Sequence, residues 1–137
     1  MVALAVGAYL LVNWFVTSDR ERVEAEVERL VSLARRGGEG AASEILDALA
    51  EDYRGSRPFG RDDIAAYLRR YVAQGKIREL STGGFKTLWD GEEILVPILR
   101  IDAAVSGAAY TLILTVRFAE RDGAWKVVDI TRWRMGR

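Results

Sequence analysis

The segment from Trp125 to Trp133 alternates in a way that could place one acid in an apolar pocket. In a β-strand every second side chain points to the same face. One face of this segment would then carry Trp125, Val127, Asp129, Thr131 and Trp133. Because both tryptophans of the segment belong to this set, we expect it to be the inner face. Burial beside two indoles would raise the pKa of Asp129, which makes Asp129 a candidate general base.

A structural role for Asp129 competes with the catalytic one. Buried charges in proteins are normally paired with an opposite charge. Arg117 and Arg100 lie in the two long strand-like segments that precede Asp129, and either could neutralise it. The remaining alternative is a binding pocket in which Asp129 does no chemistry. We favour the structural ion pair.

The composition excludes several classes of function. The 137 residues make one domain. They contain no Cys and no His, which rules out thiol chemistry, His-dependent catalysis and most zinc sites. The formal net charge of zero argues against a general nucleic-acid binder. The acid pairs Asp62-Asp63 and Glu92-Glu93 point apart on a helix or strand, and no glycine pattern fits a nucleotide loop. We therefore expect no metal, nucleotide or other cofactor.

The N-terminus is apolar. Residues Val2 to Val16 carry no charge, and a helix of that length spans roughly 23 Å. Tyr9 and Trp14 are aromatics that favour membrane interfaces. We predict a single-pass membrane anchor over residues 1–17 and a separate domain over 18–137, with a slight preference for the extracytoplasmic side. A cleaved signal peptide and an apolar first helix of the domain are the alternatives.

The hydrophobic period changes once along the rest of the chain. Helical spacing predicts helices over 18–36, 43–50 and 62–75, the first opened by a capping box of Ser18 and Glu21. Strand-like runs follow at 77–80, 85–89, 94–105, 109–119 and 125–133. Helices followed by a meander of strands predict an α+β fold, in which three helices pack on a curved antiparallel sheet.

Three local patterns carry a resemblance to a known superfamily. They are Asp52-Tyr53, the run Pro58-Phe59-Gly60-Arg61-Asp62-Asp63-Ile64 followed by Tyr67-Leu68, and the ending Asp122-Gly123-Ala124-Trp125-Lys126-Val127-Val128. With this order of elements, the chain resembles the nuclear transport factor 2-like superfamily, which includes polyketide cyclases and ketosteroid isomerase. The resemblance implies a cone-shaped, cystatin-like roll whose interior can hold a pocket. It says little about function, because this fold hosts many activities.

A pocket inside such a cone would draw on the aromatic and charged residues of the helices and strands. The candidates for its lining are Tyr53, Tyr67, Tyr71, Trp89, Tyr110, Arg117, Trp125, Asp129 and Trp133. Tyr67 and Tyr71 share one helix face, and such pairs are more often core than ligand site. Arg100 and Asp102 share one strand face, where we favour an outer ion-pair ladder over a pocket pair.

These observations favour a membrane-anchored, non-catalytic module that binds a protein partner or a small apolar ligand. The alternative is a small lyase or isomerase that uses Asp129 as acid or base with a tyrosine as helper. Many proteins of this fold dimerise through the outer face of the sheet, where we expect Val128 and Ile130 to supply apolar surface for a homodimer.

Overall fold

The predicted order of helices and strands is confirmed. The computed structural model describes the backbone of residues 2–136 and the side chains of residues 3–8 and 19–131. The helices are α1 (Val2–Arg36), α2 (Glu39–Asp47), α3 (Arg61–Tyr67) and the π-helical turn η1 (Leu68–Val72). The strands are β1 (Ile77–Thr82), β2 (Leu88–Asp90), β3 (Glu93–Val105), β4 (Ala108–Arg121) and β5 (Ala124–Gly136).

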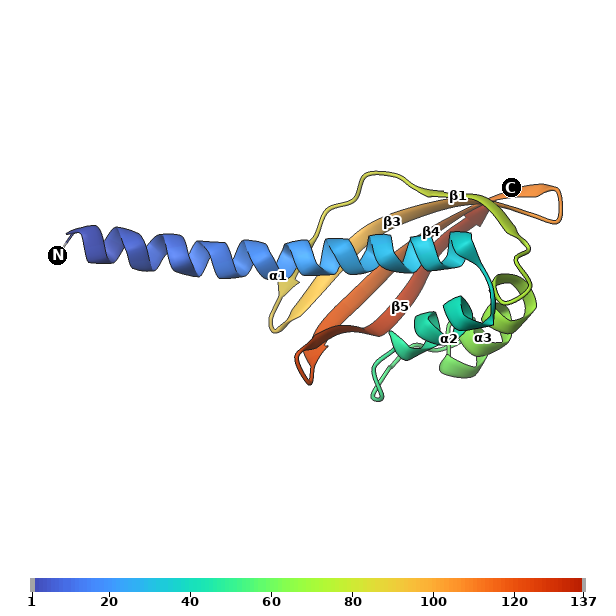
Figure 1. Ribbon diagram of the computed structural model, residues 1–137, viewed down its shortest axis with the longest axis horizontal. Coiled ribbons are helices and arrows are strands. Elements are labelled where there is room, and N and C mark those ends of the chain that lie inside the picture. The colour runs from blue at the N-terminus through green and yellow to red at the C-terminus, as the bar shows by residue number, and fades with distance from the viewer. Residues whose placement is uncertain (1, 137) are drawn as a thin grey trace.

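The strands form one antiparallel sheet that curves around α1. Its order is β1-β3-β4-β5, and β2 pairs with the other half of the β3 edge. Figure 1 shows α1 lying along the sheet, with α2 and α3 gathered at one end. The inner face of β3, β4 and β5 packs on α1 through Ile94, Val96, Leu99, Leu114, Val116, Phe118, Trp125 and Val127, which meet Val23 and Val27. This apolar contact is the main core of the domain.

The first helix is longer than the sequence pattern predicted. We expected a helix to begin at Ser18, but α1 runs unbroken from Val2 to Arg36, and the expected domain boundary at residue 17 falls inside it. The physical reason is that neither Gly nor Pro occurs between Ala8 and Arg36, so nothing stops the helix at the polar residues Thr17 and Ser18. Gly37, at a φ of 72°, ends it.

The N-terminal half of α1 extends beyond the sheet (Figure 1). Leu4 and Val6 are exposed there, and Val23 is the first residue in the core among the α1 side chains that the structure describes. Among the residues that the structure describes, no helix reaches the combined length and hydrophobicity needed to span a bilayer.

A register shift near the start of β5 changes which residues face the core. Phe118 lies opposite Val127, and Arg117 lies opposite Asp129, so Val128 is an extra residue between two pairs. Such a β-bulge reverses the alternation of side chains beyond it. Trp125 and Val127 face the core as predicted, whereas Asp129 pairs with a residue of the outer face.

Candidate binding site

Three of the tyrosines predicted to line a pocket lie together at the end of the sheet near α3. Tyr67 ends α3, Tyr71 belongs to η1, and Tyr110 lies on β4. The ring centroids of Tyr67 and Tyr71 are 4.7 Å apart. Burial raises the pKa of the Tyr67 phenol, and the nearby phenols of Tyr71 and Tyr110 raise it further. The π-turn that carries Tyr71 is a rare element that is frequent at functional sites.

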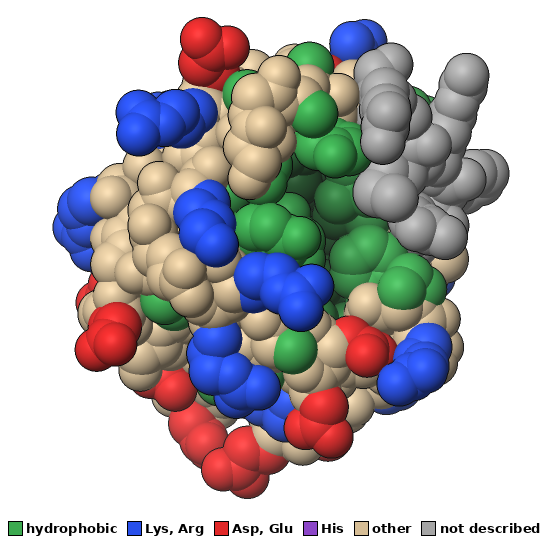
Figure 2. Space-filling model, turned by 90° about the vertical axis from the view of Figure 1, so that its right-hand side faces the viewer, with side chains coloured by type: hydrophobic (Ala, Val, Ile, Leu, Met, Phe, Trp, Pro, Cys, Tyr) green, Lys and Arg blue, Asp and Glu red, His purple; other side chains and the backbone are tan. Residues whose placement is uncertain are grey.

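These phenols adjoin apolar side chains from both layers. Ile64 of α3 and Ile101 of β3 each touch both main clusters of the core, and Leu112 of β4 lies opposite Ile101. We call the group formed by Ile64, Tyr67, Tyr71, Tyr110 and Leu112 the mouth. Figure 2 shows that this end of the molecule is hollowed, that the hollow is hydrophobic, and that Lys and Arg side chains lie along one side of it.

Asp129 does not belong to the mouth, and the predicted inner face of β5 is wrong at Asp129. The bulge at Val128 turns Asp129 to the outer face, opposite Arg117. Its charge acts there on Tyr53 and Arg54. The expected ion pair with Arg117 or Arg100 is absent among the side chains that the structure describes.

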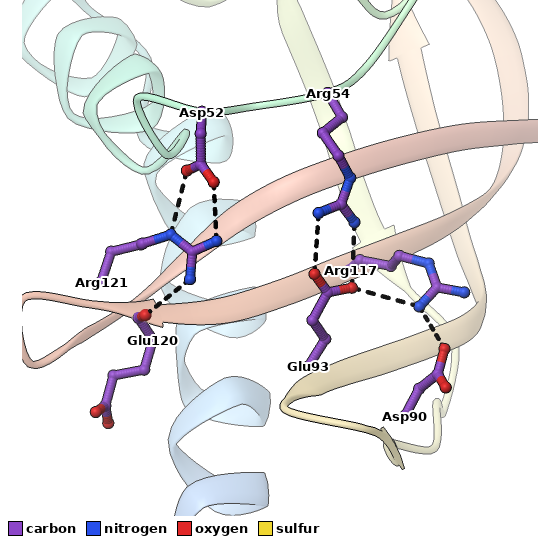
Figure 3. Close-up of polar contacts among 7 residues, drawn as sticks. All are labelled: Asp52, Arg54, Asp90, Glu93, Arg117, Glu120 and Arg121. Carbon is purple, nitrogen blue, oxygen red and sulfur yellow. Dashed lines mark hydrogen bonds and ion pairs between the residues drawn. The ribbon is translucent and has the colours of Figure 1, made fainter.

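Arg117 instead belongs to a surface network on the outer face (Figure 3). Its guanidinium lies 2.6 Å from Asp90 and 3.5 Å from Glu93. Arg54 donates two hydrogen bonds to Glu93, at 3.0 and 3.1 Å, and holds the pKa of that carboxyl below its usual range. The network ties the segment after α2 to β3 and β4, so its role is structural.

Tyr53 also points away from the mouth. Its hydroxyl donates a 2.6 Å hydrogen bond to the carbonyl of Phe59, which closes the loop between α2 and α3. Burial, followed by the charge of Asp129, raises the pKa of Tyr53 to about 12. A phenol that stays protonated and already donates its proton is poorly suited to proton transfer at neutral pH.

The predicted tryptophans lie at the other end of the sheet. Trp89 on β2 and Trp125 on β5 form an edge-to-face pair with centroids 5.9 Å apart. Trp125 is 9% exposed, which confirms its predicted place in the core. We call this end, where α1 leaves the sheet, the exit end. The remaining candidate, Trp133, lies outside the described side chains.

Two other surface predictions have different outcomes. Arg100 and Asp102 lie on the outer face as predicted, but they pair with each other along β3 and not in a ladder across strands. Arg100 Nε and Asp102 Oδ2 are 3.1 Å apart, and Thr111 donates to the same carboxylate. Val128 and Ile130 are not the outer apolar surface that we expected. Val128 is fully buried with Ala50 and Ala119, and Ile130 packs against the core. A homodimer through the sheet stays a prediction, without these two residues.

The sequence pattern missed the apolar part of the mouth. Ile64 and Leu112 are ordinary aliphatic residues, and only the pairing of β3 with β4 sets Leu112 opposite Ile101, which packs against the same core as Ile64. No group of three acidic, His or Cys side chains that could hold a metal gathers within the described part of the chain.

Comparisons with known proteins identify the fold. No protein-family model and no curated protein matches the sequence. Solved structures do match. A nuclear transport factor 2-like protein with a cystatin-like fold from Novosphingobium aromaticivorans gives a TM-score of 0.68 at 18% identity, over 90% of this chain and 86% of that one.

Two further matches describe proteins of the same kind. A nuclear transport factor 2-like protein of unknown function from Pseudomonas putida gives a TM-score of 0.65 at 13% identity, over 85% of this chain and 86% of that one. Another from Pseudomonas aeruginosa gives 0.58 at 15% identity, over 82% and 94%. The chain therefore has the nuclear transport factor 2-like, cystatin-like α+β fold.

Proposed function

We propose that the protein is a non-catalytic binding module whose mouth takes a small apolar ligand. The observation that carries the proposal is the hydrophobic hollow in Figure 2. Tyr67, Tyr71 and Tyr110 lie close to one another at the same end of the sheet. Ligand sites in proteins are typically concave and mostly apolar, with a few polar groups that fix orientation. The phenols of Tyr67, Tyr71 and Tyr110 supply those polar groups.

The position of Asp129 argues against the enzyme alternative. A general base must come within hydrogen-bond reach of its substrate. Asp129 lies on the opposite face of the sheet from Phe118 and the rest of the core, beside the charged network of Arg54 and Glu93. The mouth therefore binds without the acid that the enzyme mechanism needs.

The test is binding of an uncharged fluorescent apolar probe, phenylnaphthylamine, to the full chain. Tyr67→Ala should weaken probe binding about fivefold, because it removes part of the aromatic wall and about 1 kcal/mol of contact. Tyr67 is 50% exposed, so the fold should survive its truncation.

The matched control is Leu88→Ala at the exit end. Leu88 is 51% exposed and apolar, but it lies on β2, away from the mouth. Its variant should bind the probe like the natural chain. Equal losses in the two variants, or no loss in either, would show that the probe does not occupy the mouth.

We further propose that the N-terminal half of α1 inserts into a membrane. This half extends past the sheet, its residues from Val2 to Val16 carry no charge, and Leu4 and Val6 are exposed (Figure 1). An apolar helix without a protein partner is stabilised by burial in lipid or against another helix.

The experiment compares the full chain with a chain that begins at Ser18. The full chain should stay with membranes after an alkaline carbonate wash. The shorter chain should be released and remain folded, because it keeps Val23 and Val27, the α1 residues found in the main core among the described side chains. Release of the full chain would refute insertion. Unfolding of the shorter chain would make residues 2–17 part of the domain core.

A further inference from the structure

Strand β2 is fixed to α1 at the exit end. The Nε of Arg20 donates a 3.0 Å hydrogen bond to the hydroxyl of Thr87, which is fully buried and directly precedes β2. A cavity of about 500 Å³ at this end is lined by Asp19 of α1 and by Trp89 of β2, among other residues. Leu88 and Trp89 therefore lie beside the turn of α1 that contains Asp19 and Arg20.

Two large apolar side chains are exposed at this position. Leu88 is 51% exposed, and Trp89 is 39% exposed although it stands edge to face with Trp125. Figure 1 shows that the end of the sheet where α1 leaves it faces the N-terminal half of that helix. The exposed apolar surface of β2 therefore lies on the side of the domain from which the apolar part of α1 projects.

The apolar part of α1 ends close to the level of β2. Its uncharged run ends at Val16, and the first charged residue after it is Asp19. Because α1 is unbroken, Arg20 lies about 6 Å along the helix axis from Val16. The headgroup layer on each side of a bilayer is about 5–8 Å thick. When the apolar run lies in the hydrocarbon core, Leu88 and Trp89 therefore lie at the depth of the headgroups.

We propose that Leu88 and Trp89 form a second membrane contact, in the headgroup layer of the bilayer that α1 enters. This contact rests on the insertion of α1 proposed above. Tryptophan is enriched at membrane interfaces because its ring is apolar and its N–H is polar. Burial of Leu88 removes exposed apolar surface from water. Because Arg20 holds Thr87, the contact also sets the orientation of the domain, with the mouth at the end away from the membrane (Figure 1).

The lipid surface that fits this end is zwitterionic. Acidic residues outnumber basic ones among the residues that line the cavity, and both Glu92 and Glu120 are exposed there. An anionic lipid surface repels such carboxylates, whereas phosphatidylcholine carries no net charge. The proposed contact therefore depends on apolar and aromatic side chains and not on attraction to anionic lipids.

The test places the full chain in phosphatidylcholine nanodiscs in which part of the lipid carries a nitroxide on its headgroup. A nitroxide broadens nearby proton resonances beyond detection. The indole N–H signal of Trp89, assigned by its absence from Trp89→Phe, should be lost in these discs. The backbone N–H signal of Tyr67 at the mouth should stay sharp. Labelled discs of anionic phosphatidylglycerol should broaden the Trp89 signal less.

The variant that tests the contact is Leu88→Asp, which places a charge on the proposed lipid-facing surface. It should restore the Trp89 signal in labelled phosphatidylcholine discs. The matched control is Ile98→Asp, because Ile98 is apolar and 62% exposed but lies at the bulge in the middle of β3. This control should lose the Trp89 signal as the natural chain does. An unchanged Tyr67 signal shows that each variant is folded.

The outcomes separate this contact from the insertion of α1. A sharp Trp89 signal in a chain that resists the carbonate wash would overturn the contact and leave insertion standing. A lost Trp89 signal in Leu88→Asp would show that α1 alone holds the domain near the lipid, which also overturns the contact. Equal broadening in phosphatidylglycerol discs would overturn the zwitterionic partner. Release of the full chain by the wash would overturn both insertion and contact.

Discussion

The mouth and the exit end both present aromatic side chains, but they differ in charge and in what the aromatics do. At the mouth, Tyr67 is half-exposed, and this end of the molecule has an apolar hollow with Lys and Arg along one side (Figure 2). At the exit end, the buried Trp125 and the partly exposed Trp89 border a cavity that is also lined by acidic residues. Aromatic residues in the sequence therefore do not show by themselves where a pocket lies in this fold. The strand register decides which aromatics meet.

The largest expected effect is on the free energy of unfolding, because the aromatic residues at the two ends differ in burial. Trp125→Ala should lower the free energy of unfolding by about 3–5 kcal/mol, because Trp125 is 9% exposed and packs in the core. Tyr67→Ala at the mouth should cost about 1 kcal/mol, because half of that side chain already contacts solvent. Urea unfolding measures both. Losses of equal size would mean that the mouth is part of the core.

The order of elements could be predicted from the sequence, and the composition of the site could not. Gly and Pro positions and the change of hydrophobic period predict most ends of the helices and strands within a few residues, but not the start of α1, which begins at Val2 and not at Ser18. The single sequence gives no sign of the bulge at Val128, because the bulge depends on how β5 pairs with β4. That one extra residue moves Asp129 out of the predicted pocket and leaves Trp125 in place.

Alkaline pH should destabilise the loop between α2 and α3, which the Tyr53 hydroxyl closes beside Asp129. This loop belongs neither to the mouth nor to the exit end. The unfolded phenol of Tyr53 ionises near pH 10, whereas in the folded chain its pKa is about 12. A raised folded pKa gives stability that is fully present below pH 10 and is lost as the pH rises toward 12. Solvent screening of this half-buried group limits the loss to about 1 kcal/mol. The free energy of unfolding of Tyr53→Phe should not show this part of the loss at alkaline pH. If the variant lost as much stability as the natural chain, the raised pKa of Tyr53 would not be the cause.

Acidic pH should destabilise the ion-pair network on the outer face of the sheet more than it affects the mouth. Arg121 lowers the pKa of Asp52 mainly by hydrogen bonding, and Arg54 does the same to Glu93. A lowered folded pKa gives stability that is present above the unfolded value of about 4 and is lost as the pH falls through the folded pKa. The stability of Glu93→Gln should therefore fall less steeply with acid than that of the natural chain. Asp52 is exposed and Glu93 is partly exposed, so solvent screening should keep the difference small. Phenylnaphthylamine binding at the mouth should keep the same pH profile in the Glu93 variant.

The smallest stability effect should come from Asp129. Asp129→Asn should change the free energy of unfolding at pH 7 by no more than about 0.5 kcal/mol, because the carboxylate has no ion pair among the described side chains and stands on the outer face. A loss near 3 kcal/mol would restore the buried ion pair that the sequence suggested.

The most direct test of the account compares Tyr67→Ala with Asp129→Asn in one binding experiment with phenylnaphthylamine. If the mouth is the binding site and Asp129 belongs to the outer face, Tyr67→Ala weakens the probe about fivefold and Asp129→Asn binds it like the natural chain. The opposite pattern, with full binding by Tyr67→Ala and weakened binding by Asp129→Asn, would place the ligand beside Asp129 and contradict the account.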